Sequence, residues 1–249
     1  MLLQAAPTAA IAAAPIVAII IDDLGYNHVQ GKRAIDLPAE LTYAVIPDTH
    51  HATTLARYAN DAGKEVMIHL PMENNANLPM SRIALTSGLT REDFQTVLDN
   101  ALSRVPFARG INNHMGSTLT QQPQAMSWLM DSVKLRQLFF VDSRTTPKTI
   151  ASSMAMQKNI HTASRDIFLD NERNLYAIDI QFRKMIRMAR HKQSIVAIGH
   201  PYPATLEYLE LALPMLASEG IRIVPVSEVI RTRLAGQQVA SGRAPIGAE

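Results

Sequence analysis

Ile-Val-Ala-Ile-Ile-Ile-Asp-Asp, residues 16–23, is the stretch of this chain that best predicts its fold. Six consecutive apolar residues, mostly β-branched, are typical of a strand buried in a core. Two aspartates follow at once, at the carboxyl end of that strand. In parallel α/β folds, functional side chains cluster just beyond this end of each strand. The stretch therefore predicts a buried strand and the place where a site would lie.

Similar short apolar runs predict further buried strands, at residues 41–46, 65–69, 110–113, 137–141, 159–162, 195–199 and 221–226. Segments with helical periodicity separate these runs. The clearest begins at Thr90, where Asp93 completes a capping box and an apolar stripe follows. Further helices are expected over residues 48–63, from Pro123, over 174–191 and over 204–217.

Alternating strands and helices place this chain in the α/β class, because crossover helices force the strands to pair in parallel. About eight such units within 249 residues favour a closed or nearly closed (β/α) barrel. An open doubly wound sheet is the alternative. We expect one barrel domain over residues 16–235. A leader remnant or linker is expected at 1–15, and a disordered tail rich in Gly, Ala, Ser and Gln at 236–249.

The composition excludes several classes of function. Net charge is only +2, and no run of basic residues is interleaved with aromatics, so nucleic acid is not expected as a partner. The chain has no cysteine, so His, Asp or Glu would have to hold any metal ion. Its first 21 residues are uncharged, but Pro7 and Pro15 interrupt them and the first basic residue is Lys32. We therefore expect neither a membrane span nor an intact signal peptide.

Polar residues that follow the predicted strands are the candidates for chemistry. They are Asp22, Asp23, His69, His114, Asp142 and His200. Each has a structural alternative when taken alone, since a strand-end aspartate often caps a helix and a buried histidine is often only hydrogen-bonded. Two adjacent carboxylates, however, repel each other unless a cation or a shared proton lies between them.

Asp23, His69 and His114 together offer one oxygen and two nitrogens, a set that suits zinc or a similar divalent ion and leaves a position open. Glu73 follows His69 by four residues, but a solvent-facing loop position is favoured for it. Asp142 either orients a catalytic group or caps the next helix.

His200 is the candidate for a catalytic histidine. It stands in Gly-His-Pro-Tyr-Pro, where two prolines stiffen the backbone around it and fix the direction of its side chain.

Five motifs in order along the chain carry a family resemblance: IIIDDLGY, MIHLPME, INNHMGS, FFVDS and AIGHPYP. From about residue 16 to 230 the chain resembles the divergent polysaccharide deacetylases, relatives of the chitooligosaccharide deacetylases of the carbohydrate esterase class. The resemblance implies a distorted (β/α) barrel of about seven strands and a divalent metal ion, usually zinc. It also implies hydrolysis of N-acetyl or O-acetyl groups on an oligo- or polysaccharide by metal-activated water.

The resemblance also implies roles for single residues. Asp22 resembles the general base of the family, Asp23 its metal ligand and His200 its general acid. The chain departs from the mainstream members, which have a His-x-x-x-His pair where this chain has His69 and Glu73. His114 falls where those members have an Arg-Pro motif, so the assignment of His69 and His114 as ligands rests on their strand-end positions.

Two alternatives remain beside the deacetylase. One is a non-catalytic glycan-binding or cell-envelope domain that keeps the barrel and the metal. The other is a different metal-dependent hydrolase on a barrel, acting on an amide or a phosphoester. By the same resemblance, we expect a periplasmic or cell-envelope protein.

Overall fold

A single curled parallel sheet is the centre of the computed structural model, which describes residues 14–76 and 78–240. Among these residues the strand order is β6-β5-β4-β3-β2-β1-β8-β7, with β9 beside β1. The strands are β1 (Ile16–Leu24), β2 (Thr42–Val45), β3 (Glu65–Met72), β4 (Gly110–Met115), β5 (Phe139–Asp142), β6 (Thr162–Ser164), β7 (Ile167–Phe168), β8 (Ser194–Gly199) and β9 (Arg222–Ile223).

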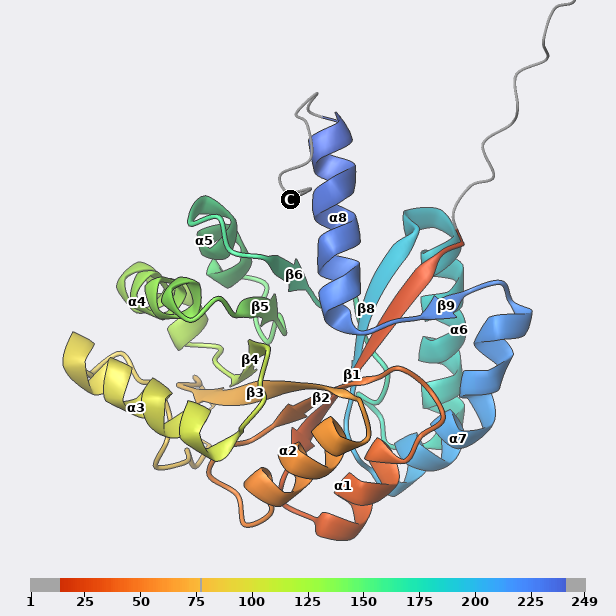
Figure 1. Cartoon of the computed structure of the whole chain (residues 1–249), viewed down its shortest axis with the longest axis horizontal. Helices are drawn as coiled ribbons and strands as arrows, with labels where there is room; N and C mark the ends of the chain where they lie inside the picture. Colours follow the sequence, from red (N-terminus) through yellow and green to blue (C-terminus); the bar gives the residue numbers. More distant parts are fainter. Residues whose placement is uncertain (1–13, 77, 241–249) are drawn as a thin grey trace, which may run out of the picture.

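All described helices except the last connect strands and cover the outside of the sheet (Figure 1). The expected capping at Thr90 is confirmed, because its side chain accepts a hydrogen bond from the backbone N–H of Asp93. Pro123 and Pro203 occupy first-turn positions, where a missing N–H costs nothing. The helical segments are α1 (His28–Ile35), α2 (Ala52–Asp61), α3 (Arg91–Arg104), the 3-10 turn η1 (Leu119–Gln121), α4 (Pro123–Leu135), α5 (Ala151–Gln157), α6 (Leu175–Lys192), α7 (Pro203–Ser218) and α8 (Val226–Ala240).

The two edge strands of this sheet are consecutive in the sequence, and this closes the curl. β6 pairs with β5, and β7 pairs with β8. Between them, the N–H of Arg165 donates to the carbonyl of Asp142 in β5, while the N–H of Asp166 donates to the carbonyl of Val196 in β8. One segment thus joins both ends of the sheet. The expected distorted barrel is confirmed, with eight strands in order along the curled sheet where about seven were expected, and with β9 beside β1.

Side chains of each strand alternate between two apolar clusters. In β1, Val17, Ile19 and Ile21 face outward and belong to the large cluster that also includes side chains of α1 to α7. The alternate residues of β1 are Ile16, Ala18 and Ile20, and they belong to a smaller inner cluster with side chains of α8. The inner side of the sheet is therefore filled from one end by α8.

Helix α8 differs from the sequence-based expectation. The strand expected at 221–226 is shorter, since β9 ends at Ile223 and α8 begins at Val226. The helix continues to Ala240, so residues 236–240 are helical instead of disordered. Packing of its first turns on the inner cluster fixes the helix, and each added residue then gains a hydrogen bond without repeating the cost of helix nucleation. The remaining tail (241–249) and residues 1–13 of the expected leader lie outside the described residues.

Within the described residues, no helix is both long and apolar enough to cross a lipid bilayer.

The inner cluster predicts which side of α8 is critical for stability. Ile230 is 2% exposed and packs in that cluster, whereas Leu211 in α7 is 77% exposed. Ile230→Ala should lower the free energy of unfolding by about 2–5 kcal/mol, because it removes buried methyl groups and leaves a cavity. Leu211→Ala should change it by less than about 0.5 kcal/mol. Urea unfolding measures both, and equal effects would contradict the packing described for α8.

Candidate metal centre

The inner rows of four strands turn from apolar to polar at their carboxyl ends. In β1 the row of residues 16, 18 and 20 continues to Asp22, and in β8 the row of residues 196 and 198 continues to His200. In β3 the inner Met67 is followed by His69, which pairs across the sheet with Asn112 of β4. Residues two apart on a strand share a face, so these polar groups extend the inner cluster at one end of the barrel.

A bulge in β1 brings two adjacent aspartates to the same place. The pairing of β1 with β2 shifts between Ile21 and Leu24, and Asp23 has a left-handed backbone with φ of 59°. In a regular strand, consecutive side chains point to opposite faces, but a bulge interrupts that alternation. Nε2 of His69 consequently lies 3.6 Å from Oδ2 of Asp22 and 3.2 Å from Oδ1 of Asp23.

The three expected ligands lie together. Oδ1 of Asp23 is 3.2 Å from Nε2 of His69 and 3.1 Å from Nδ1 of His114. All three ligand atoms lie within 4.8 Å of one another. Four ligands placed tetrahedrally at about 2.0–2.1 Å from a zinc ion would be roughly 3.3 Å apart. The spacing of Asp23 from both imidazoles therefore fits a small divalent cation.

The same oxygen contacts two imidazoles but forms no well-aligned hydrogen bond. Oδ1 of Asp23 is buried and, within the described part of the chain, accepts no hydrogen bond of acceptable geometry, although Nε2 of His69 and Nδ1 of His114 lie close to it. A buried carboxylate oxygen without a hydrogen bond is costly, and a cation between Asp23, His69 and His114 would reduce that cost.

The carboxylates and imidazoles of the cluster shift one another's pKa values. Burial raises the pKa of Asp22, although the charges of His69 and His200 oppose this. For His69, burial works against protonation, but the charges of Asp22 and Asp23 outweigh it and raise the pKa. Burial also opposes the charge of Asp23, yet the facing imidazoles of His114 and His69 lower its pKa well below the usual range.

Asn112 links the base candidate to the ligand set. Its amide Nδ2 donates to Oδ1 of Asp22 at 2.8 Å, and its Oδ1 lies 2.7 Å from Nδ1 of His69. Because a carboxylate only accepts, the amide oxygen is left to accept from Nδ1–H of His69. With Nδ1–H engaged in this way, Nε2 is the ring nitrogen that faces Asp23, and it would offer its lone pair to a metal ion that displaces its proton.

His200 lies at the edge of this cluster and has a different partner. Its Nε2 is 4.0 Å from Oδ2 of Asp23, and its Nδ1 is 2.9 Å from Oδ1 of Asp170. The other oxygen of Asp170 accepts from the backbone N–H of His200 and from Oγ1 of Thr205. Burial lowers the pKa of His200, but the hydrogen bond and charge of Asp170, followed by the charges of Asp23 and Asp22, raise it to about 9.

Two other candidates from the sequence have structural contacts. Oδ1 of Asp142 accepts from the N–H of Arg144, and its Oδ2 accepts from Thr149 and the N–H of Ser152. The expected catalytic position of Asp142 is therefore not supported: its neighbour Val141 is in the inner cluster, so Asp142 points outward by alternation. Glu73 is not part of the ligand group, and its Oε2 accepts from the N–H of Ser87.

Sequence reasoning missed Asn112 and Asp170. Asn112 stands two residues before His114, so period-two alternation would have placed both on the same face of the strand. Asp170 follows the run Ile-Phe-Leu at residues 167–169, the same pattern of an apolar run ending in aspartate that identified Asp22. That run is short, and β7 within it has only two residues.

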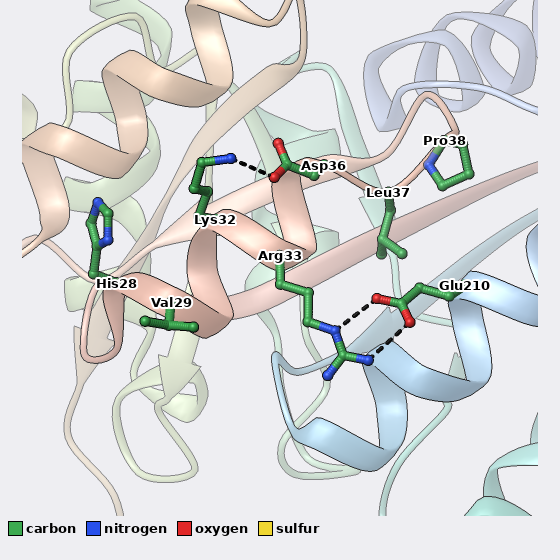
Figure 2. A pocket seen from close by; sticks show the side chains of 8 residues that line it. All are labelled: His28, Val29, Lys32, Arg33, Asp36, Leu37, Pro38 and Glu210. Carbon is green, nitrogen blue, oxygen red and sulfur yellow. Dashed lines mark hydrogen bonds and ion pairs between the residues drawn. The ribbon is translucent and has the colours of Figure 1, made fainter.

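A separate hollow of about 340 Å³ lies between α1 and α7, and its charged groups already have partners (Figure 2). Arg33 donates two hydrogen bonds to Glu210, and Lys32 donates one to Asp36. None of the residues that line it belongs to the cluster around Asp23. These contacts favour the cluster as the functional site.

Comparison with known proteins identifies the family to which the chain belongs. Residues 19–230 match the sequence model of the family described as divergent polysaccharide deacetylase. The uncharacterized protein YibQ of Escherichia coli (strain K12) is 36% identical over 193 residues, which are 78% of this chain and 60% of that protein. The match to this chain thus spans less than two thirds of the length of that relative.

Solved structures show the same fold. The uncharacterized protein ATU2773 of Agrobacterium tumefaciens C58 superposes with a TM-score of 0.83 at 20% identity, covering 89% of this chain and 92% of that one. A BA3943 mutant, named as a CE4 family pseudoenzyme with restored enzymatic activity, has a TM-score of 0.58 at 13% identity and covers 87% of this chain and 68% of that one. At these identities the likeness establishes the barrel.

The contact between Asp170 and His200 predicts a pH dependence. In the metal-free protein, Asp170→Asn should lower the pKa of His200 from about 9 toward its ordinary 6.5. A raised pKa of a histidine contributes stability that is complete below pH 6.5 and is lost as the pH rises through about 9. Wild type should therefore lose more stability than Asp170→Asn as the pH rises from 6.5 to about 9.

An NMR titration of the histidine ring protons measures the pKa, with Asp99→Asn as the control, since Asp99 is an exposed carboxylate on α3 paired with Arg136. An unchanged pKa of His200 in Asp170→Asn would show that Asp170 does not set it.

Proposed function

The chain belongs to the divergent polysaccharide deacetylase family, and on that premise we propose that it is a metal-dependent hydrolase that removes acetyl groups from a glycan. One observation carries the proposal: Asp23, His69 and His114 form a ligand set with an orphaned carboxylate oxygen. Asp22 and His200 lie beside that set and offer the two proton-transfer groups that hydrolysis of an acetyl amide needs.

The donors of the set favour zinc over magnesium or calcium, because two imidazole nitrogens and one carboxylate are typical zinc ligands. When bound, such an ion supplies a Lewis acid that polarises the acetyl carbonyl and makes water easier to deprotonate. His69 and His114 would hold it through Nε2 and Nδ1, and Asp23 through Oδ1.

Asp22 is proposed as the general base. Its Oδ1 is occupied by the amide of Asn112, while its Oδ2 faces the ligand set at 3.6 Å from Nε2 of His69. Oδ2 is therefore the atom that would take the proton from the attacking water as the new C–O bond forms. Burial raises the pKa of Asp22, which makes it a better proton acceptor than an exposed aspartate.

His200 is proposed as the general acid. In the metal-free protein, a pKa of about 9 keeps its ring protonated at neutral pH, and Asp170, the residue that raises this pKa most, lies outside the ligand set. Nδ1–H is engaged by Asp170, and Nε2–H faces the carboxylate of Asp23, so Nε2–H would donate to the leaving group as the bond to the acetyl carbon breaks. The leaving amine or hydroxyl then departs neutral, and acetate is the second product.

We propose an acetylated oligo- or polysaccharide as the substrate and the periplasm or cell envelope of a bacterium as the location of the protein. The match to the divergent polysaccharide deacetylase family supports both proposals.

A non-catalytic glycan-binding or envelope domain is the second candidate function. It is favoured by one departure from the mainstream pattern, since Glu73 stands in the second position of the His-x-x-x-His pair and bonds to the N–H of Ser87. A fold of this kind does not guarantee turnover. Release of acetate from an N-acetylated chitooligosaccharide by zinc-loaded protein separates the two functions. Turnover of a phosphate ester in place of acetate release would instead favour a different metal-dependent hydrolase.

The ligand assignment predicts metal loss in single variants. Asp23→Ala and His114→Ala should each bind zinc at least about 10-fold more weakly, because each removes one of three protein ligands. Calorimetric titration of metal-free protein with zinc, together with elemental analysis, measures this. Glu73→Gln is the matched control, since its carboxylate lies outside the ligand group and should leave zinc affinity unchanged. Full zinc occupancy in both ligand variants would overturn the assignment.

The proton-transfer assignment predicts variants that keep the metal but lose turnover. Asp22→Asn and His200→Ala should each reduce kcat by about 10²–10⁴-fold while retaining zinc, because each removes a group that moves a proton. The double variant should lose less than the product of the two effects, since both groups serve one reaction path. Loss of zinc from Asp22→Asn would show that Asp22 is a ligand.

A further inference from the structure

Two aromatic rings lie nearly parallel to the imidazole of His200. The ring of Phe168 is 6.1 Å from it between centroids with planes 22° apart, and the ring of Tyr202 is 5.2 Å from it with planes 27° apart. Each ring also has a guanidinium over it: Arg165 lies 3.7 Å from the centroid of Phe168, and Arg173 lies 3.9 Å from that of Tyr202. The imidazole of His200 is thus stacked with two flat neighbours.

The backbone of Tyr202 is unusually restricted. It stands between Pro201 and Pro203, and a residue before proline is confined to extended conformations. Its φ of −74° and ψ of 144° agree with that restriction. Although Tyr202 is the N-cap residue of α7, its side chain forms no capping hydrogen bond. The ring therefore has no capping role in α7, and its backbone holds it over His200.

A second group fixes the outer side of that ring. Nη2 of Arg173 donates to the hydroxyl of Tyr202 at 2.9 Å, while its guanidinium lies over the ring. Arg173 is exposed and belongs to the loop between β7 and α6. This loop also contains Asp170, so the two groups that contact His200 and Tyr202 are only three residues apart in sequence.

One hydrogen bond cannot orient a proton donor by itself. The bond from Nδ1 to Asp170 fixes one atom of the imidazole, but the ring can still tilt about that bond. Two flat neighbours determine the plane of the ring, and with it the direction of Nε2–H. Because a displacement of about 1 Å can cost about 100-fold in rate, the plane of a general acid matters for turnover.

We propose that Tyr202, held by Arg173 and two prolines, is a positioning residue that sets the plane of the His200 ring for proton transfer. This inference rests on the proposed function of His200. Tyr202 is part of neither apolar cluster, so its ring contributes little to the core. Removal of the ring should therefore affect the orientation of His200 more than the stability of the fold.

The test compares Tyr202→Leu and Tyr202→Phe with wild type in the full chain. NMR relaxation of the Cε1–H group of His200 in metal-free protein reports how firmly the ring is held, without any need for activity. We expect the imidazole of His200 to be more mobile in Tyr202→Leu than in wild type. In Tyr202→Phe, which keeps an aromatic ring at position 202, its mobility should not increase. For zinc-loaded protein and N-acetylated chitooligosaccharide, kcat of Tyr202→Leu should fall about 10–100-fold with KM unchanged. Tyr202→Phe should lose less than about fivefold, the effect of one hydrogen bond.

Two further variants keep the test decisive. Tyr176→Leu makes the same change at a tyrosine that is 78% exposed on α6, and it should match wild type in both measurements. Arg173→Gln should increase the mobility of the His200 imidazole, but less than Tyr202→Leu does. If Tyr202→Leu does not fold, the result for Arg173→Gln decides whether the inference holds. Equal ring order in wild type and in Tyr202→Leu, or in Arg173→Gln in that case, would overturn the inference. If wild type releases no acetate, the proposed function fails, but the ring-order measurement still decides the role of Tyr202.

Discussion

The approach of one buried and one half-buried carboxylate to the same imidazole is the interaction on which the site depends. Asp22 is 2% exposed, and Asp23 follows it directly in the chain. Such a pair is tolerable only if positive charge lies close by. The bulge in β1 and the left-handed backbone of Asp23 place both carboxylates next to His69, and His114 supplies the second imidazole. The unusual backbone is thus compensated by the electrostatics that it creates.

The barrel decides which polar residues reach this place. On each strand only one of the two rows faces inward, so a strand-end residue joins the site only if it has the right parity. Closure also matters, because the segment that bonds to both β5 and β8 brings β7, and hence Asp170, beside His200. Helix α8 fills the opposite end of the interior. The polar groups therefore gather at one end of an otherwise apolar interior.

The barrel could be predicted from the sequence because apolar runs followed by polar residues identify strand ends. The same reasoning predicted the positions of the side chains that meet at or border the cluster: Asp22, Asp23, His69, His114 and His200. Asp142 was misplaced because that reasoning counted strand ends without their parity. Asp170 was missed because β7 is too short to stand out as a strand, and its pairing with β8 is set by closure of the barrel. The bulge at Asp23 was also beyond prediction, since it depends on the register with β2, and α8 was missed because its stability comes from the inner cluster.

His69 and His200 differ in which charges favour their protonated forms, and this difference supports the proposed roles of His69 as a metal ligand and His200 as the general acid. The protonated form of His69 is favoured by Asp22 and Asp23, the same charges that would attract a cation. A cation at Asp23 would therefore displace that proton and leave Nε2 free to bind, while the neutral amide of Asn112 holds Nδ1. His200 owes its proton first to Asp170, which is outside the ligand set. Its proton can consequently persist when a cation neutralises the cluster, and that is the state a general acid needs.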